Sequence, residues 1–503
     1  MSRKLISFLA VILLAVILPL FARELPKVAR LRLENSSSPF SFDISSYRGD
    51  LKALPIGVFD SGLGGLTVLA QILKLDTFNN SDIERGADGM PDFALEKFIY
   101  LGDQANMPYG NYSAEGKTDF LRELVLKDAI FLLGKRYWPR RSAEKPAFDK
   151  PPVKAIVIAC NTATAYGIDD LLEAVELWQV PVFVLGVVNA GVRGALARAG
   201  GQGAVAVMAT VGTCSSMGYV RAVDQAWCRA GLEPPPVVQQ GCLGLAGAIE
   251  GDRSYIDPAR GCDAAVYRGP SVSNPMARID TAILSRYGFE RDGLTGDLEA
   301  TGALRLNSVE NYIRYHTLTL VENYRKTRPQ TPIRVVILGC THFPFYTESF
   351  AAAFERLRGV SAGDDSEVKP YEALLWQKID FIDPAENTAV ELYTTLRARG
   401  LLLTQGTQAA IPTDEFYISV TNPGLAGAEL DKNGAFTYGY KYGRHPGMLE
   451  IEYVKRVPMH RGNLSAEALE MIEASTPEVW KRLVEFNINS PRLSGVPDSL
   501  RLN

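Results

Sequence analysis

The chain has 503 residues, of which 47% are hydrophobic and 22% are charged. It is therefore long enough to bury a large core and to form more than one lobe. A net charge of -4 with no basic tract argues against a nucleic-acid-binding protein, which needs clustered Lys and Arg on one face.

The chain begins with a basic stretch and an apolar run from Leu5 to Ala22, after which charge returns at Arg23. This pattern is typical of a secretory signal or a signal anchor, because an apolar run with no polar face rarely packs on a domain. We expect residues 1–22 to direct export to the periplasm or to anchor the chain in a membrane. Cleavage and anchoring both stay open, since the run is borderline in length for a bilayer and offers only part of a cleavage pattern.

From Pro55 to about Asn422 short apolar runs alternate with Gly- or Thr-containing turns and helical stretches, which predicts βα units and a parallel sheet. The runs are continuously apolar, as strands covered on both faces should be. The predicted strands are Ile56–Phe59, Phe98–Leu101, Ala155–Ala159, Val182–Val187, Ala204–Met208, Val335–Leu338 and Ile379–Ile382.

Three stretches rich in Gly, Asp, Pro and Ser interrupt this alternation, and we interpret residues 76–96, 251–305 and 357–372 as surface insertions. Residues 401–503 differ in composition from the preceding βα units, because they are polar and contain prolines. They contain strand-like pieces at 415–420 and 448–454 and a helical piece at 465–472. We interpret them as an appended C-terminal extension whose role the sequence does not indicate.

Two cysteines stand in matching sequence frames. Lys154-Ala-Ile-Val-Ile-Ala-Cys-Asn-Thr and Arg334-Val-Val-Ile-Leu-Gly-Cys-Thr-His share a basic residue, an apolar strand, a small residue, a cysteine and polar side chains. Each cysteine, Cys160 and Cys340, is predicted to lie just past the carboxyl end of a parallel strand, where open α/β sheets place their ligand sites.

A matched pair of thiols suits the inversion of a carbon centre, because one group must remove a proton from one face while another supplies it to the other face. A thiol has a reference pKa near 8.5, and a helix N-terminus or polar neighbours lower it. The carbanionic intermediate needs hydrogen-bond donors around the substrate carboxylate. Asn161, Thr162, Thr341 and the backbone N–H groups at the helix starts are the candidates.

Other interpretations of these cysteines stay open. A single free cysteine is often merely buried, and Cys160 could form a disulfide with Cys340, which would abolish the proposed chemistry. The other cysteines, Cys214, Cys228, Cys242 and Cys262, are either paired or buried. A metal site is disfavoured, because there is no Cys-x-x-Cys and only one of the four histidines, His342, lies in a motif.

The first predicted strand runs into Ile56-Gly-Val-Phe-Asp-Ser-Gly-Leu-Gly-Gly-Leu-Thr. Taken alone this could be a phosphate-binding loop, but it has neither the dinucleotide fingerprint nor the Lys-Ser/Thr ending of a P-loop. Asp60 would repel a phosphate. An acidic side chain here better suits an ammonium group or a cysteine that needs a proton-transfer partner.

With these motifs in order, the chain resembles the glutamate racemase family. The resemblance is carried by Gly57-Val-Phe-Asp-Ser-Gly-Leu-Gly-Gly, Gly102-Asp with Pro108-Tyr-Gly, Ala159-Cys-Asn-Thr-Ala, Ala209-Thr-Val-Gly-Thr, and Gly339-Cys-Thr-His-Phe-Pro. Cys242 followed by Glu250 also fits. Together these motifs span about two thirds of the chain, from Ile56 to Ala389.

The resemblance implies two similar α/β lobes with parallel sheets, an active site in the cleft between them, and no cofactor. We expect lobe A at residues 55–180, lobe B at 181–344 with the insertion 251–305, and a return to lobe A at 345–400. The small-molecule partner would be an amino acid, and the product a D-amino acid for peptidoglycan of the cell wall. A homo-oligomer stays open.

The resemblance also implies residue roles. Cys160 and Cys340 would be the acid/base thiols for the D and L faces, assisted by Asp60, His342 and Glu250. The amino acid would be held by Asp60, Ser61, Tyr109, Gly110, Asn161, Thr162, Thr341 and His342. Each residue also has a purely structural alternative: Tyr109 would end a turn, Ser61 would cap a helix, and His342 would be a core residue with its hydrogen bonds made.

The chain departs from the family in its predicted export signal, and its Asp103-Gln-Ala-Asn-Met-Pro stretch lacks an arginine that the family often carries there. Two functions of different class follow. One is a cofactor-independent racemase of glutamate, or of aspartate or another amino acid; the other is an exported, non-catalytic protein that binds an acidic amino acid or a cell-wall fragment. Two thiols favour the enzyme, whereas an oxidising compartment favours the binding protein.

Overall fold

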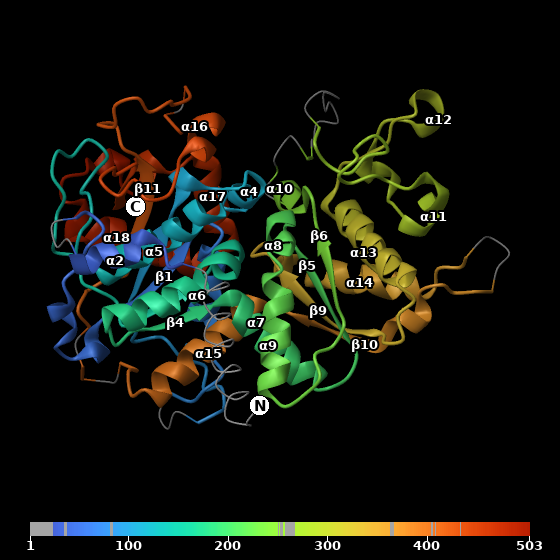
Figure 1. Cartoon of the computed structure of the whole chain (residues 1–503), viewed down its shortest axis with the longest axis horizontal. Coiled ribbons are helices and arrows are strands. Elements are labelled where there is room, and N and C mark those ends of the chain that lie inside the picture. The colour runs from blue at the N-terminus through green and yellow to red at the C-terminus, as the bar shows by residue number, and fades with distance from the viewer. Residues whose placement is uncertain are drawn as a thin grey trace, which may run out of the picture.

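Two α/β lobes stand side by side in the computed structural model of the chain (Figure 1). It describes residues 24–34, 38–80, 84–249, 251, 255–256, 267–362, 367–403, 406–407, 409–432 and 434–503. The predicted export segment 1–22 lies outside these residues. Within them, no helix is both long and apolar enough to cross a bilayer.

The first lobe is built on a sheet in which six strands of the described chain pair in the order β12-β11-β2-β1-β3-β4. All neighbours are parallel except β11 and β12. The strands are β1 (Ile56–Asp60), β2 (Phe98–Gly102), β3 (Ala155–Ile158), β4 (Phe183–Gly186), β11 (Glu415–Thr421) and β12 (Val454–Pro458).

Helices cover both faces of this sheet, which is why its strands are continuously apolar. One face packs on α2 (Lys27–Glu34), α5 (Thr118–Leu133) and α6 (Asn161–Trp178). The other face packs on α3 (Leu66–Lys74), α15 (Pro384–Ala398) and α18 (Pro477–Asn489). Shorter helices of this lobe are α4 (Gly110–Ala114), α16 (Tyr438–Gly443) and α17 (Ala466–Ser475).

The second lobe is built on a parallel sheet with the order β10-β9-β5-β6 among the described residues. Its strands are β5 (Ala204–Ala209), β6 (Val237–Gly241), β9 (Ile333–Gly339) and β10 (Leu375–Ile382). One face packs on α13 (Val309–Lys326) and α14 (Thr347–Arg358), the other on α7 (Val187–Ala199) and α9 (Gly218–Arg229). Also here are α8 (Val211–Ser215), α10 (Leu245–Ile249), α11 (Leu284–Tyr287), α12 (Leu298–Thr301), β7 (Leu294–Thr295) and β8 (Arg305–Leu306).

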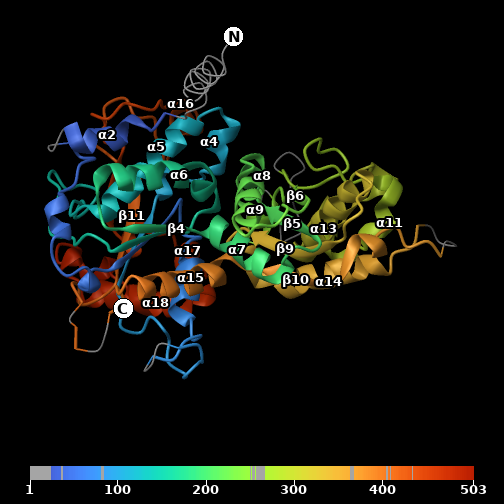
Figure 2. The ribbon, with the colours of Figure 1, turned by 60° about the horizontal axis from the view of Figure 1, so that its bottom comes forward.

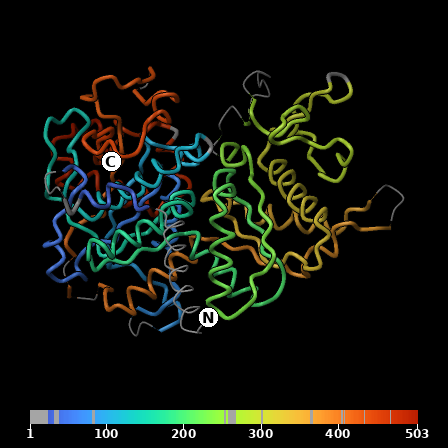
Figure 3. Tube along the Cα trace, in the orientation of Figure 1, coloured from blue at the N-terminus to red at the C-terminus, as the bar shows by residue number. Residues whose placement is uncertain are grey.

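The chain crosses between the lobes twice. It leaves the first sheet after β4, and α7 then lies at the junction and packs against α15, the helix by which the chain returns (Figure 2). As a result the early and late parts of the chain share one lobe, while the middle part forms the other (Figure 3).

The predicted α/β class with two parallel-sheet lobes is confirmed, but the predicted lobe boundaries are off. β4 pairs with β3 and so extends the first lobe past residue 181. The return to the first lobe comes at α15 and not at residue 345, because β10 pairs with β9 in the second sheet.

The segment after residue 401 forms no separate subdomain. β11 pairs in parallel with β2, and β12 pairs with β11, so both strands extend the first sheet. The strand predicted at 448–454 lies further along, at β12, and α17 matches the predicted helical piece.

Two of the three predicted insertions are part of the lobes, one through packing and the other through its own helices and strands. Phe78 and Phe93 of the first are buried, and both rings contact Tyr393 of α15. The described part of the second carries α11, α12, β7 and β8. Residues 363–366 of the third lie outside the described chain.

Candidate active site

Asp60 and Cys160 lie together at the carboxyl edge of the first sheet. Asp60 ends β1, and Cys160 is the residue before α6, where its sulfur accepts a hydrogen bond from the Ala163 amide at 3.4 Å. The thiol donates to Ser61 Oγ at 3.6 Å. Both side chains are buried, at 6% and 7% exposure, because adjacent parallel strands bring their ends to one edge.

Burial sets the protonation of this pair. The Asp60 carboxylate accepts hydrogen bonds from the amides of Gly62 and Gly65, each at 3.0 Å, yet desolvation still raises its pKa. Desolvation, and then the negative charge of Asp60, raise the pKa of Cys160 to about 12. The thiol therefore carries its proton at neutral pH. A cation placed beside Asp60 would lower both pKa values.

Cys340 occupies the corresponding place after β9 in the second lobe. It is buried, and its sulfur lies 3.9 Å from Nδ1 of His342. Gly339 precedes it, and a Cβ there would lie 2.8 Å from the ring of Tyr219. Only glycine permits this approach. The Tyr219 ring therefore packs directly against the backbone before the cysteine.

The loop between β1 and α3 reaches from one cysteine to the neighbours of the other. At its start Ser61 contacts Cys160. Near its end, a Cβ on Gly64 would lie 3.0 Å from Thr341 Oγ1 and 3.6 Å from the His342 ring. The two predicted cysteine motifs, far apart in sequence, therefore border one loop at the junction of the lobes.

Two further contacts join the facing edges of the sheets. Asn161 accepts a hydrogen bond from the Tyr219 hydroxyl at 2.8 Å. Thr162 Oγ1 lies 3.5 Å from Thr213 Oγ1, and Thr213 is bonded in turn to Thr210 at 3.0 Å. Asn161 and Thr162 are buried here, so polar side chains of both lobes meet beside Cys160.

Tyr219, Thr213 and Thr210 were not singled out as site residues by the sequence. Thr210 and Thr213 belong to a motif that carries the family resemblance, and this was the available signal. Tyr219 had none, because it follows α8 on a separate helix and reaches the site only through the packing of α9 against Gly339.

Tyr109 and Gly110 occupy different surroundings. The Tyr109 side chain is buried, and its hydroxyl lies 2.6 Å from Asp103 and 2.7 Å from Asp128, so it points into the lobe. Gly110 lies against Gly212 of α8, where an added Cβ would come within 2.9 Å of the Gly110 Cα. Of this predicted pair, Gly110 is the one at the junction.

Cys242 follows β6 and is buried, which raises its pKa well above the usual value, and the nearby Cys214 and Cys340 raise it further. Glu250, predicted to assist catalysis, lies outside the described residues, as does Cys262. Among the cysteines that the structure describes, Cys160 and Cys340 are not joined in a disulfide. The alternative disulfide between these two is therefore not formed.

A cavity of about 420 Å³ opens beside the loop between β1 and α3. Gly64, Thr67, Gln104 and His342 line it, and so does Met471 of α17. Among the described residues no group of three His, Cys, Asp or Glu side chains could hold a metal ion. The chemistry that the described site offers is proton transfer by thiols, a carboxylate and a histidine.

Comparison with curated proteins finds relatives over about half of the chain. Glutamate racemase of Thermus thermophilus is 35% identical over 206 residues, 41% of this chain and 62% of the relative. Glutamate racemases of two Pseudomonas putida strains are 32% and 31% identical, covering 68% and 86% of their own length. The chain thus spans less than two thirds of the Thermus relative. No family model matches the chain.

Solved structures of racemases are also similar. Glutamate racemase RacE1 of Bacillus anthracis has a TM-score of 0.42 and 23% identity, over 73% of this chain and 88% of that one. An aspartate racemase homologue from Pyrococcus horikoshii has a TM-score of 0.31 and 15% identity, over 68% of this chain and 99% of that one.

Proposed function

Because the chain belongs to the glutamate racemase family, we propose that it interconverts the L and D forms of an amino acid, with glutamate as its substrate. The observation that carries the proposal is the loop between β1 and α3. It contacts Cys160 through Ser61 and the neighbours of Cys340 through Gly64, so two thiols from different lobes border one site.

In the proposed reaction one thiolate removes the α-proton and becomes a thiol, while the electron pair of the C–H bond is delocalised into the substrate carboxylate. The opposite thiol then donates its proton to the other face of the α-carbon. With Cys160 protonated, the L-to-D direction begins with Cys340 as the base. The substrate ammonium group beside Asp60 would lower the pKa of Cys160 and so permit the reverse direction.

Asp60 and His342 are the proposed proton-transfer partners of Cys160 and Cys340, since each lies within reach of its cysteine. Ser61, Asn161, Thr162 and Thr341 are the proposed ligands of the amino acid. Relatives named as glutamate racemases support glutamate over aspartate. Because the Tyr109 hydroxyl points into the lobe, only the backbone of Tyr109 and Gly110 is proposed to contact the amino acid.

The test is racemisation of L- and D-glutamate by the full-length chain under reducing conditions, followed by circular dichroism, with L-aspartate and L-alanine as comparison substrates. We expect the signal of either glutamate enantiomer to decay to zero. Faster decay with aspartate would reassign the substrate. Saturable binding of glutamate with no decay would establish the non-catalytic binding protein instead.

We further propose that the chain acts outside the cytoplasm, on the strength of the apolar run from Leu5 to Ala22 alone. Fractionation of cells that produce the full-length chain, compared with a variant carrying Arg at Leu13 and Leu14, tests this. The chain should be found in the periplasm or membrane and the variant in the cytoplasm. Recovery of both in the cytoplasm would contradict export.

A further inference from the structure

The loop from Asp103 to Gly110 is held by the C-terminal extension. From α16, Lys441 Nζ donates to the Met107 carbonyl at 2.6 Å and the Tyr442 hydroxyl donates to the Pro108 carbonyl at 3.2 Å. From β11, Ser419 Oγ accepts a hydrogen bond from the Ala105 amide at 3.0 Å. Backbone groups at three successive points of the loop therefore depend on residues after 401.

Arg444, directly after α16, brings a buried cation to the same loop. Its side chain, 5% exposed, donates from Nη2 to Asn106 Oδ1 at 2.8 Å and to the Tyr112 hydroxyl at 2.9 Å. Asn106 in turn donates to both carboxylate oxygens of Asp103, at 3.0 and 2.9 Å. The extension therefore brings a buried cation to a loop that carries no Lys or Arg of its own.

The aromatic rings around Arg444 fix the guanidinium in place. Its central carbon lies 4.8 to 5.1 Å from the ring centroids of Phe120, Phe436 and Tyr453, within the range of cation–π attraction. Its Nε also donates to the Lys441 carbonyl at 2.9 Å. Arg444, which joins the extension to the loop, is thus fixed in position by its own contacts within the lobe.

A further hydrogen bond from the extension supports the residue that follows the loop's proline. Arg456 of β12 donates to Asp128 at 2.7 Å, and the Tyr109 hydroxyl lies between Asp128 and Asp103. These contacts fix the Tyr109 ring. Gly110 comes next in the chain and lies against Gly212 of the second lobe, so the position of the loop decides how the lobes meet.

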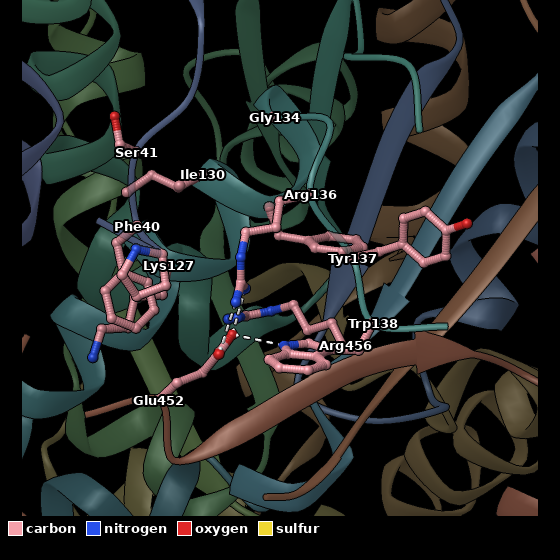
Figure 4. Close-up of a pocket in the computed structure, with 12 residues that line it drawn as sticks. Phe40, Ser41, Lys127, Ile130, Gly134, Arg136, Tyr137, Trp138, Glu452 and Arg456 are labelled. Atoms are coloured by element: carbon pink, nitrogen blue, oxygen red, sulfur yellow. Dashed lines mark hydrogen bonds and ion pairs between the residues drawn. The ribbon is translucent and has the colours of Figure 1, made fainter. Parts of the chain in front are cut away.

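The extension is packed tightly on the first lobe. Glu452, just before β12, accepts hydrogen bonds from Arg136 at 2.9 Å and from the Trp138 ring at 3.0 Å (Figure 4). The cavity beside this group, which Phe40 and Arg456 also line, has a volume of only about 20 Å³, enough for one water molecule. The support of the loop is therefore anchored and has little room to shift.

We propose that the C-terminal extension is a positioning element of the racemase site. In it, Lys441, Tyr442 and Arg444 fix the loop Asp103–Gly110 against the second lobe, and Arg444 supplies the buried cation that the loop itself lacks. This inference rests on the proposed function. The three residues touch no reacting atom in it; they act through the loop and are positioning residues.

The test compares single variants of the full-length chain. Tyr442→Phe removes one hydroxyl, Lys441→Met one cation, and Arg444→Gln the guanidinium, with Arg444→Lys as the conservative variant. The matched controls are Tyr438→Phe, whose hydroxyl in the same helix donates to Glu115 on the surface at 2.7 Å, and Lys432→Met at an exposed position. Each variant is measured for kcat, KM and amide deuterium exchange of residues 103–112.

We expect the three variants to lose roughly 10- to 100-fold in kcat/KM, because a displacement of about 1 Å near a reacting centre has effects of that size. Faster exchange should be confined to the loop, the melting temperatures of Tyr442→Phe and Lys441→Met should stay near that of the parent, and Arg444→Lys should recover part of the activity. Both controls should behave as the parent.

Unchanged kinetics and unchanged loop exchange in Tyr442→Phe and Lys441→Met would overturn the inference and leave the racemase intact. If the parent chain racemises no amino acid, the proposed function fails instead. The exchange data then decide the inference alone: faster exchange in the variants supports the loop's dependence on the extension, and unchanged exchange overturns it.

Discussion

Asp60 has two opposing effects on Cys160. Burial, and then the negative charge of Asp60, raise the thiol pKa to about 12 and hold the proton on the sulfur, which suits an acid. Asp60 also places a carboxylate where a substrate ammonium group would bind, and that cation would offset the charge. The same side chain thus prepares Cys160 as a proton donor and ties its activation as a base to the arrival of substrate.

Replacing Asp60 with Asn should lower the pKa of Cys160, since the negative charge is removed, and should reduce kcat by about 10²- to 10⁴-fold, the usual loss for a proton-transfer partner. The pH dependence of Cys160 alkylation, followed on its own peptide by mass spectrometry, reports the pKa. Asp50→Asn, an exposed helix cap, is the matched control. An unchanged alkylation profile would show that Asp60 does not govern the thiol.

The loop between β1 and α3 depends on glycine, because it has no room for a side chain at Gly65. At Gly65 an added Cβ would lie 2.5 Å from Asp60 Cβ and 2.9 Å from Ala159 Cβ, both closer than real contacts allow. The glycines let the loop fold over the ends of β1 and β3. This brings their amides to Asp60 and the loop itself to Thr341.

Gly65→Ala should therefore destabilise the fold by about 1–3 kcal/mol, as overpacking does, and should lower turnover because Asp60 must move. Gly49→Ala is the control, since a Cβ there meets nothing within 4 Å. Urea unfolding measures the free energy of unfolding. Equal stability of the two variants would mean that the loop accommodates a side chain.

Prediction from sequence succeeded where an element's own residues determine it. The buried strands of both sheets are continuous apolar runs, and both cysteines were correctly placed past the ends of such runs. β6 was missed because Val237–Gly241 reads Val-Val-Gln-Gln-Gly and is a half-buried edge strand beside β5. β11 was found as a strand, but its pairing with β2 was not, because partners distant in sequence leave no local pattern.

The site was predictable to the same extent. Site residues that directly follow strands were predicted from the sequence. Tyr219 and Arg444 were not, because the packing of distant segments brings Tyr219 to the site and Arg444 to the loop beside it. Tyr109 was predicted to hold the amino acid, but the structure directs its hydroxyl to Asp103 and Asp128. The spacing of residues in the sequence does not indicate that two buried carboxylates lie beside one hydroxyl.

At the scale of the molecule, the extension links to the core through buried charges. A hydroxyl has one proton, so Tyr109 can donate to only one of its two carboxylates, and the other must carry a proton. Desolvation, and then the charge of Asp103, raise the pKa of Asp128 to about 7. Asp128 therefore holds this proton in the folded chain below pH 7.

This shift makes stability depend on pH. In the unfolded chain Asp128 ionises near 3.8 and in the folded chain near 7, so between these values the folded state binds more protons. The free energy of unfolding should then fall by up to about 1.4 kcal/mol per pH unit as the pH rises from about 4 to 7. Asp128→Asn should lack this part of the slope. Parallel curves for parent and variant would contradict the assignment.

The central claim is that two thiols act from opposite faces of one α-carbon, and deuterium tests it most directly. Full-length chain is incubated with L-glutamate in heavy water, and the α-hydrogen of both enantiomers is followed at early times. We predict that new D-glutamate carries α-deuterium while the remaining L-glutamate keeps its protium, and that Cys160→Ser and Cys340→Ser each abolish racemisation. Protium carried over into the D product, or racemisation that survives the loss of either cysteine, would contradict the two-thiol account.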